Sequence, residues 1–436
     1  MLDIKFIREH AEEVKNATRN KNVDLDVDRL LELDKKRLEQ LQQIEQLQAE
    51  KNKLNDLLPS ATGEEKAALL EQGKNVKEKL AQAEPEYKKI KEEFDGLMYK
   101  IPNIPSDDTP VGKDESENKI LRQVGKIPKF DFQLKEHWQL GEDLDLIDTD
   151  RAVKVSGSRF VYLKGELVLL EFALMQFALS VLTDEKQLKK IIENNKLDIP
   201  SQPFIPVLPP VLIRPEIMNR MARLDPEEMY SLEKDGLNLI GSAEHTLGSM
   251  YADEILEAKN LPIRMVGFSP AFRREAGSYN KDMKGMLRLH QFNKLEMESF
   301  TLPEKSLDEQ NFIVAIQEYL MQALELPYQV VQICTGDMGK PDYRQIDIEA
   351  WMPGQNKYRE TNTSDLINDF QARRLNTKIR REDEQLEYVH MNDATAFSER
   401  PLVAILENYQ QADGSVVIPE VLRKYMPGNM ERIILK

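Results

Sequence analysis

The chain has 436 residues, of which 41% are apolar, so it is long enough for two domains and can bury a sizeable core in at least one of them. Its 60 Lys and Arg residues stand against 76 Asp and Glu residues, a net charge of −16 that disfavours non-specific binding to a phosphate backbone but allows a local basic patch. DNA is therefore not expected as a partner.

Cysteine, histidine and apolar runs exclude further classes of protein. The single cysteine, Cys334, rules out an intramolecular disulfide and a cysteine-rich zinc module, and it fits a reducing compartment. The five histidines show neither H-x-x-H nor H-E-x-x-H spacing, so a histidine-based metal site is not expected. The first ten residues carry charges where a secretory signal needs an apolar run, and the longest apolar stretch, residues 167–182, is short for a bilayer. These features predict a cytoplasmic protein without a membrane partner.

Residues from about 28 to 100 have the composition of long helices, dense in Glu, Lys, Gln and Leu. Apolar residues recur over 76–97 in alternating steps of four and three, the spacing that lines one seam of a coiled coil. A looser apolar stripe covers 30–58, and the segment 59–63, Pro-Ser-Ala-Thr-Gly, breaks both helices. Two helices separated by a short break predict an antiparallel hairpin. Its pattern fits a dimerisation coiled coil and a ligand-reaching arm equally well.

The Pro-rich polar segment 101–110 predicts a linker, with an N-terminal domain over 1–110 and a second domain over 111–436. Beyond it, short β-like runs are separated by helical stretches without a regular alternation, which predicts an α+β fold with an antiparallel sheet. The expected strands lie at 159–163, 237–240, 263–268, 328–333 and 345–351, and the expected helices at 165–196, 246–259 and 305–325.

The signatures of common nucleotide-binding enzymes are absent. The sequence contains no G-x-x-x-x-G-K-[ST] motif, and no G-x-G-x-x-G follows an expected strand. No Ser or Cys lies in a recognisable triad context. A P-loop enzyme and a Rossmann dehydrogenase are both disfavoured.

Residues 272–296 predict a β-hairpin with a chemically unusual face. Apolar runs before Phe272 and from Met286 to Met297 suggest two strands, and the Gly-, Asn- and Lys-rich middle suggests a long turn. The first strand ends in Arg273 and Glu275, and the return strand places four side chains on one face at period two: His290, Phe292, Lys294 and Glu296. Arg can bind a phosphate, Glu can accept from amino groups and Phe can stack on a base, so this face suits a nucleotide. A solvated charged hairpin is the alternative.

Two stretches of this hairpin, Phe272-Arg-Arg-Glu-Ala-Gly-Ser and Arg288-Leu-His-Gln-Phe-Asn-Lys-Leu-Glu296, resemble motif 2 of the seryl-tRNA synthetases, which are class II aminoacyl-tRNA synthetases. The resemblance extends along the whole chain in the family's order. The hairpin over about 28–100 resembles the family's tRNA-binding arm. Further similar segments are 170–174 with 207–212 (motif 1, which builds the family's dimer interface), 334–337, 347–354, 369–374 and 400–410 (motif 3).

The resemblance implies a class II antiparallel-sheet catalytic domain preceded by an antiparallel coiled-coil arm. It implies a homodimeric serine–tRNA ligase that converts L-serine and ATP to seryl-adenylate and pyrophosphate, then transfers serine to the 3′ end of tRNA(Ser), with tRNA(Sec) a further candidate. ATP and Mg²⁺ are the implied substrate and ion. Such chemistry needs positioning and charge neutralisation rather than a strong protein base, which agrees with the lack of a catalytic His or Cys. We expect His245, His290 and Cys334 to be packing residues.

Motif positions imply roles at the ATP end of the site. Arg273 would hold the α-phosphate and the serine carboxylate, and Glu275 would recognise adenine. Phe292 and Arg400 would stack on the two adenine faces. The implied ATP-binding residues are Arg273, Arg274, Glu275, Leu289, Phe292, Glu360, Thr361, Asn362, Thr363 and Arg400, with Arg273, Glu275 and Arg400 as the catalytic set. Glu360 and Thr363 would ligate Mg²⁺ on the ATP phosphates, because hard oxygen ligands suit that ion.

The same resemblance implies a serine-binding set. Gly241-Ser-Ala-Glu244 matches the family's Thr-x-Glu element with Ser242 in place of Thr, and Glu296 would bind the amino group and hydroxyl of serine. The implied serine-binding residues are Ser242, Ala243, Glu244, Arg273, Glu296, Asn392 and Thr395.

The chain departs from the family before motif 3, where Asn-Gly-Ser or Asn-Gly-Thr is usual and this sequence reads Met391-Asn-Asp-Ala-Thr-Ala. Counting back from Arg400 puts Ala394 at the hydroxyl-reading position. A one-residue deletion puts Thr395 there and Asp393 at the Asn position. We favour Thr395, because a site that selects a hydroxyl needs a polar partner to reject alanine, but the alignment leaves both open.

Overall fold

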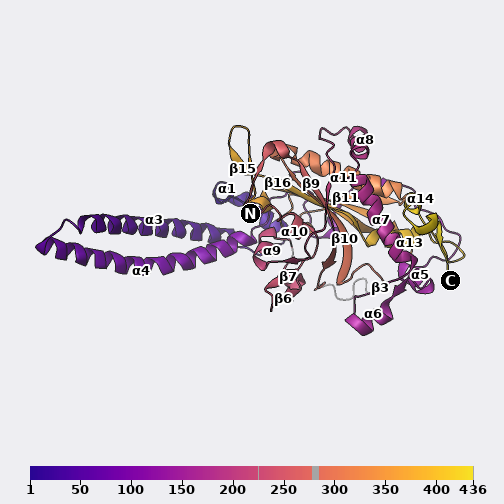
Figure 1. The fold of residues 1–436 in the computed structure, drawn as a ribbon, viewed down its shortest axis with the longest axis horizontal. Helices are drawn as coiled ribbons and strands as arrows, with labels where there is room; N and C mark the ends of the chain where they lie inside the picture. The colour runs from indigo at the N-terminus through magenta and orange to yellow at the C-terminus, as the bar shows by residue number, and fades with distance from the viewer. Residues whose placement is uncertain (224, 277–283, 436) are drawn as a thin grey trace. The chain divides into compact units, whose positions relative to one another are not determined.

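The computed structural model describes residues 1–435 except residue 224 and residues 277–283 (Figure 1). The chain forms two compact units, Met1–Pro102 and Asn103–Lys436. The division precedes the predicted boundary near residue 110 because the intervening backbone already bonds to the second unit. Asn103 N donates to Lys340 O at 2.9 Å, and Ser106 N donates to Tyr343 O at 2.7 Å.

The N-terminal unit consists of helices. Two short ones, α1 (Ile4–Glu9) and α2 (Ala11–Asn20), precede the long helices α3 (Val27–Leu57) and α4 (Gly63–Lys100). Asp26 caps α3 by accepting from Arg29 N at 2.9 Å. Between the two long helices the backbone turns at the predicted breaker, where Gly63 has a φ of +58° that glycine adopts at little cost.

An apolar seam joins α3 to α4 and confirms the predicted antiparallel hairpin (Figure 1). It is formed by Ile44, Leu47, Leu54, Val76, Leu80 and Ala83. Leu38, in the looser stripe predicted for the first helix, is instead 42% exposed. The seam is narrow, as expected for two helices that bury only the side facing each other.

The second unit is built on an eight-stranded sheet with the order β1-β11-β12-β13-β16-β10-β9-β4. Neighbouring strands are antiparallel except β4, which runs parallel to β9. The strands are β1 (Lys119–Val124), β4 (Ile205–Val207), β9 (Ile263–Phe272), β10 (Gln291–Thr301), β11 (Tyr328–Gln332), β12 (Arg344–Met352), β13 (Lys357–Asn368) and β16 (His390–Ser398). The α+β fold with an antiparallel sheet is therefore confirmed.

Shorter elements surround this sheet. The helices are α5 (His137–Asp143), α6 (Thr149–Ser156), α7 (Glu166–Leu182), α8 (Glu185–Asn195), α9 (Pro215–Met221), α10 (Glu244–Leu247), α11 (Ser306–Ala323), α12 (Phe370–Leu375), α13 (Arg400–Asn408) and α14 (Glu420–Arg423). The short strands are β2 (Ile147–Asp148), β3 (Tyr162–Leu163), β5 (Leu212–Ile213), β6 (Ser231–Leu232), β7 (Leu237–Leu239), β8 (Ile255–Glu257), β14 (Lys378–Arg380), β15 (Leu386–Tyr388), β17 (Val416–Val417) and β18 (Arg432–Ile433). The helix predicted over 246–259 is wrong, since only the short α10 overlaps it and β8 follows.

Among the described residues, no single helix is long and apolar enough to cross a membrane; α7 and α8 reach that length only as a pair bent by 74°.

One face of the sheet is covered by α7, α11 and α13 over the main apolar core. Gln317 of α11 donates to Thr363 O and Thr395 O, both at 2.9 Å, so the helix is also hydrogen-bonded to strand carbonyls. Along β10, Leu295 and Met297 belong to this core. Because side chains alternate along a strand, the residues between them face the other side of the sheet, where the pocket lies.

Candidate active site

A pocket of about 290 Å³ opens on the face of the sheet opposite α11. It adjoins a second hollow of about 820 Å³, which shares Arg288, Asp337, Glu360 and Arg400 with it. The residues lining the first pocket come from β10, β12, β13, β16, α10 and α13 and from the segments next to α9, β9, β10, β12 and α13. Residues far apart in the sequence therefore meet in one cavity.

The predicted hairpin forms one wall of this pocket. Strands β9 and β10 pair in register, and Arg273 N donates to His290 O at 3.0 Å just beyond the last strand pair. The Arg273 side chain donates to Gly241 O at 3.1 Å, and its guanidinium carbon lies 5.6 Å from the centre of the Phe292 ring. The predicted long turn includes residues 277–283, which lie outside the described residues. These contacts place a cation and an aromatic face side by side in the pocket.

Glu275 and Arg288 continue the wall on either side of the turn. Arg288 Nη1 lies 3.1 Å from Glu275 Oε2. The backbone at Glu275 has a φ of +52°, which is uncommon for a residue with a side chain and turns it out of the strand direction. Both side chains line the pocket, as does Leu289.

A further group of pocket-lining residues comes from β13 and from Arg400, the first residue of α13 in motif 3. Arg400 Nη1 lies 2.8 Å from Glu360 Oε1 and donates to Glu360 O at 3.1 Å. Thr363 Oγ1 donates to the same carboxylate at 3.4 Å. Thr361 also lines the pocket, although its hydroxyl donates to Ile348 O at 3.0 Å.

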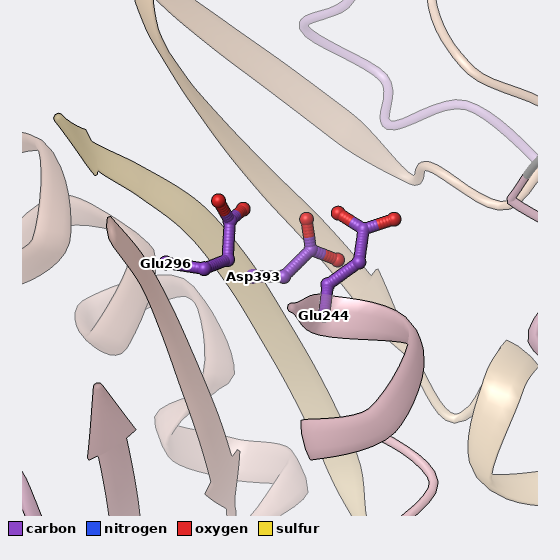
Figure 2. Close-up of side chains that lie close together, drawn as sticks. All are labelled: Glu244, Glu296 and Asp393. Atoms are coloured by element: carbon purple, nitrogen blue, oxygen red, sulfur yellow. The ribbon is translucent and has the colours of Figure 1, made fainter. Parts of the chain in front are cut away.

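Three carboxylates meet at the other end of the pocket. Glu244 from α10, Glu296 from β10 and Asp393 from β16 point toward one another, and one oxygen of each lies within 4.8 Å of the others (Figure 2). Lys294 Nζ lies 2.7 Å from Glu296 Oε2 and donates to Ser242 Oγ at 3.2 Å. Because Arg223 and Lys294 already neutralise part of this charge, the trio suits a monovalent ammonium group better than a divalent ion.

Arg223 binds four carboxylates from four segments of the chain. Its Nε lies 3.3 Å from Glu244 and its Nη2 lies 3.0 Å from Asp365, and the guanidinium also contacts Asp342 and Asp393. The arginine side chain is only 8% exposed. One buried cation thus connects α10, β13, β16 and the loop before β12.

One member of the trio, Asp393, also belongs to a row of three carboxyl groups that crosses three neighbouring strands. Asp393 on β16 pairs in register with Asp365 on β13 and with Glu298 on β10. Like charges directly opposite each other destabilise a sheet, so this row needs compensation. Arg223 compensates the two aspartates.

Protonation reduces the like-charge repulsion at the third carboxyl group of the row, that of Glu298. Burial raises the pKa values of Glu298, Asp365 and Asp393, and Arg223 opposes the rise for the two aspartates that it binds. Neither carboxyl oxygen of Glu298 bonds to a described residue. All three carboxyl groups of the row therefore favour the protonated form more than an exposed carboxyl group does.

The pKa shifts of Glu244 and His245 have separate causes. Burial alone would raise the pKa of Glu244, but Arg223, His245, Lys294 and Arg273 together outweigh burial and lower the pKa to about 2. Burial lowers the pKa of His245 to about 4, so this imidazole is neutral at pH 7. Its Nδ1 accepts from Gly241 N at 3.1 Å, which fixes the backbone that Arg273 contacts.

Most of the side chains that the motifs indicated line the pocket. They are Glu244, Arg273, Glu275, Leu289, Phe292, Glu296, Glu360, Thr361, Thr363, Thr395 and Arg400. Ser242 lies behind this lining and contacts it through Lys294.

Four of the predicted binding residues do not place their side chains in the pocket lining, so their binding roles stay predictions. Asn362 donates to Thr395 O and Ala396 O, and Asn392 lies opposite Ser299, whose hydroxyl donates to Glu309 of α11. Both asparagines face the α11 side because of strand alternation. Arg274 instead lies 5.7 Å from the Tyr230 ring, and Ala243 belongs to the apolar cluster beside α10.

The two candidates for the hydroxyl-reading position, Ala394 and Thr395, lie on opposite faces of β16. Thr395 lines the pocket opposite Glu296, whereas Ala394 is part of the apolar core. A bulge between Leu295 and Glu296 shifts the register of β10 against β16, so that Glu296, Thr395 and Asp393 share one face.

Sequence reasoning missed Arg223, Asp342 and Asp365, which lie in no recognisable motif. It also gave Lys294 no role, although the period-two pattern had placed it on the correct face. His290 lies outside the pocket lining, with its ring tilted against Phe160 at 5.3 Å and edge-on to Tyr230 at 6.2 Å between ring centres.

Two family models match separate parts of the chain. Residues 1–105 match the seryl-tRNA synthetase N-terminal domain, and residues 229–409 match the class II tRNA synthetase core domain (G, H, P, S and T). A serine–tRNA ligase from Nitrosopumilus maritimus is 37% identical, over 99% of this chain and 100% of that protein. The chain belongs to the seryl-tRNA synthetase family.

Solved structures of seryl-tRNA synthetases agree over the full length. The Pyrococcus horikoshii enzyme complexed with ATP has a TM-score of 0.88 and 38% identity, covering 100% of both chains. The cytoplasmic serine–tRNA ligase from Naegleria fowleri in complex with AMP has a TM-score of 0.83 and 28% identity, covering 100% of this chain and 99% of that one.

Proposed function

We propose that the chain acts as a serine–tRNA ligase, which activates L-serine with ATP in this pocket and then transfers serine to the 3′ end of tRNA(Ser). The observation that carries the proposal is the meeting of Arg273, Phe292 and Arg400 with the carboxylates of Glu244 and Glu296 in one cavity of a chain of this family. A phosphate-binding cation, a stacking ring and an ammonium site are the parts that amino-acid adenylation needs.

At the ATP end, Arg273 neutralises the α-phosphate while the serine carboxylate attacks the α-phosphorus in line and pyrophosphate leaves. Phe292 stacks on adenine, and Arg400 stacks on the opposite face after leaving Glu360. The Glu275 carboxylate accepts from the adenine amino group. The second step, attack of the tRNA terminal hydroxyl on the acyl carbon, releases AMP.

The donor set around Glu360 fits Mg²⁺. Glu360 and Thr363 offer a carboxylate and a hydroxyl within 3.4 Å of each other, and Asp347 lies directly opposite Thr363 on β12. Burial and the neighbouring Glu360 raise the pKa of Asp347 well above its usual range, so this group of oxygens gains from a nearby cation. Bound there with ATP, Mg²⁺ would neutralise charge on the phosphates.

At the serine end, Glu244 and Glu296 bind the ammonium group, and Thr395 lies at the hydroxyl-reading position. The N-terminal helical hairpin would contact tRNA(Ser), and the segments resembling motif 1 would form a homodimer interface. A cytoplasmic location fits these roles. A further candidate acceptor is tRNA(Sec).

The test is amino-acid-dependent exchange of pyrophosphate into ATP with serine, threonine, alanine and glycine, followed by charging of tRNA(Ser). We expect exchange with serine and a weaker rate in Thr395→Ala. Exchange with alanine or glycine instead would favour a ligase for another small amino acid, and the absence of any exchange would contradict the proposal.

A further inference from the structure

A buried histidine behind the pocket connects two of its walls. His137 begins α5 and is only 1% exposed, and α5 packs against α13, the helix that begins with Arg400 (Figure 1). The His137 backbone N donates to Glu407 Oε1 of α13 at 3.0 Å, and its Nδ1 lies 3.1 Å from the same oxygen. The imidazole is thus held by the helix that carries the motif 3 arginine.

The other ring nitrogen of His137 faces the segment that returns from the motif 2 turn. Met286 N donates to His137 Nε2 at 3.1 Å. Because a backbone N–H can only donate, Nε2 is the unprotonated nitrogen, and Nδ1 carries the hydrogen that points to Glu407. One neutral imidazole therefore bridges Met286 and Glu407, and each ring nitrogen has the role that its partner requires.

The return segment follows the surface of α5 closely at residues 284–286. Gly285 has a φ of +77°, and a Cβ at this position would lie 2.0 Å from His137 Nε2, so only glycine lets the backbone approach the imidazole this far. Lys284 Nζ lies 4.1 Å from the centre of the Trp138 ring. Three successive residues therefore contact the first turn of α5.

The segment that His137 holds leads directly into the adenine end of the pocket. Residues 286–289 all line the pocket. Arg288 lies 3.1 Å from Glu275, the proposed partner of the adenine amino group. A shift of the Met286 backbone would move both this arginine and the apolar side chains beside it.

The same connection fixes the spacing of the two groups proposed to stack on adenine. Phe292 lies on β10, directly after the return segment, and Arg400 begins the helix that carries Glu407. Glu407 is fully buried, and its second oxygen accepts from Gly354 N at 2.9 Å. A ring and a guanidinium can hold a planar base between them only when their spacing matches the base.

We propose that His137 is a positioning residue for ATP, which holds the return segment at a fixed distance from α13 and so sets the spacing between Phe292 and Arg400. This inference rests on the proposed serine–tRNA ligase function. His137 does not line the pocket, so it acts through Met286 and Glu407. Serine is proposed to bind at the opposite end of the pocket, so its binding should not depend on His137.

Two substitutions separate the roles of the two ring nitrogens. A Gln amide reaches as far as Nε2 and can accept from Met286 N, whereas the shorter Asn amide reaches only as far as Nδ1 and can donate to Glu407. The His137 backbone N keeps its bond to Glu407 in both variants. Only His137→Asn therefore releases the return segment, and His137→Gln is its matched control. We expect a similar fall in Tm in the two variants, because each loses one buried hydrogen bond.

Kinetics of serine-dependent pyrophosphate exchange distinguish positioning from a purely structural role. We expect His137→Asn to raise KM for ATP at least about 5-fold with KM for serine unchanged, and His137→Gln to keep both constants within about 2-fold. An equal rise in KM for ATP in both variants, no rise in either, or a parallel rise in KM for serine would overturn the proposal.

Gly285→Ala tests the same contact from the other side. The added Cβ would push the return segment away from His137, so we expect KM for ATP to rise as in His137→Asn, again with KM for serine unchanged. An unchanged KM for ATP in this variant would contradict the role of the contact.

Titration calorimetry with ATP alone measures binding without the reaction. We expect the Kd for ATP to rise in His137→Asn and Gly285→Ala but not in His137→Gln. This order in a chain without serine-dependent exchange would overturn the proposed function and still support the role of His137. Equal Kd values in the three variants and the unmodified chain would overturn the inference and leave the proposed function standing.

Discussion

Two arginine–glutamate pairs, one in each unit, have similar chemistry and opposite surroundings. In the N-terminal unit, Arg29 of α3 binds Glu93 of α4 at 2.8 Å, with both side chains well exposed. In the second unit, Arg264 of β9 binds Glu309 of α11 through two bonds of 2.7 and 2.8 Å, with both side chains fully buried.

The buried pair is embedded in further buried contacts, whereas the second partner of Arg29, Glu32 at 2.9 Å, is itself exposed. Arg264 also donates to Pro200 O and Gln202 O, and Ser299 donates to Glu309 at 2.7 Å. Water can replace either member of the exposed pair, but neither member of the buried one. The second unit thus depends on charges placed by its tertiary structure, whereas the helical hairpin depends on its apolar seam.

The largest expected effect separates the two units by function. Replacing residues 30–100 with a short Gly–Ser linker removes the helical hairpin but no residue of the pocket. We expect charging of tRNA(Ser) to be abolished while serine-dependent pyrophosphate exchange is retained. Equal loss of both activities would contradict the assignment of the hairpin to tRNA binding.

Breaking the buried pair comes next. Arg264→Gln leaves Glu309 without its bidentate partner in the core, so we expect the free energy of unfolding to fall by about 3–5 kcal/mol. Urea denaturation followed by circular dichroism measures this change. A loss below about 1 kcal/mol would mean that water or a neighbour replaces the guanidinium.

A smaller effect should appear in the pH dependence of stability. Burial, helped by Glu171, raises the pKa of Glu399 to about 8. The folded state then binds more protons than the unfolded one between the unfolded pKa of about 4.5 and pH 8, so this group's stabilising contribution is lost as the pH rises through that window. Glu399→Gln keeps an acceptor for Asn293 N and should flatten the decline.

Between pH 6.5 and 8, the difference in slope between Glu399→Gln and the unmodified chain reports the contribution of Glu399. His245, with its pKa lowered to about 4, contributes stability that is lost only as the pH falls from 6.5 towards 4. Tm measured at several pH values in the upper range compares the two proteins directly. The same slope in Glu399→Gln and the unmodified chain would show that Glu399 is ionised in the folded state.

The smallest effect is expected in the exposed pair. Arg29→Gln removes the ion pair to Glu93 but leaves the apolar seam of the hairpin intact. We expect no measurable change in Tm or in tRNA charging, because exposed pairs are screened by water and salt. A clear loss of stability in Arg29→Gln would show that the exposed pair also stabilises its unit, and the contrast with the buried pair would not hold.

The sequence alone determined the hairpin and the motif residues. The seam at 76–97 repeats within a single helix, so local periodicity suffices to predict it. Phe292 and Glu296 were recognisable because they alternate along one predicted strand, and Arg273 because it ends the strand that pairs with it; all three also lie in the segment that resembles motif 2.

Only the tertiary structure decided which side chains near motif 3 enter the pocket. The bulge at Glu296 is a property of two paired strands, and it turns Thr395 and Asp393 inward while Asn392 faces α11. Arg223 likewise gains its role by folding, because its four carboxylate partners come from segments distant in the chain. Local patterns record which face a residue takes along one element, whereas register and the balance of buried charges arise only when elements pair.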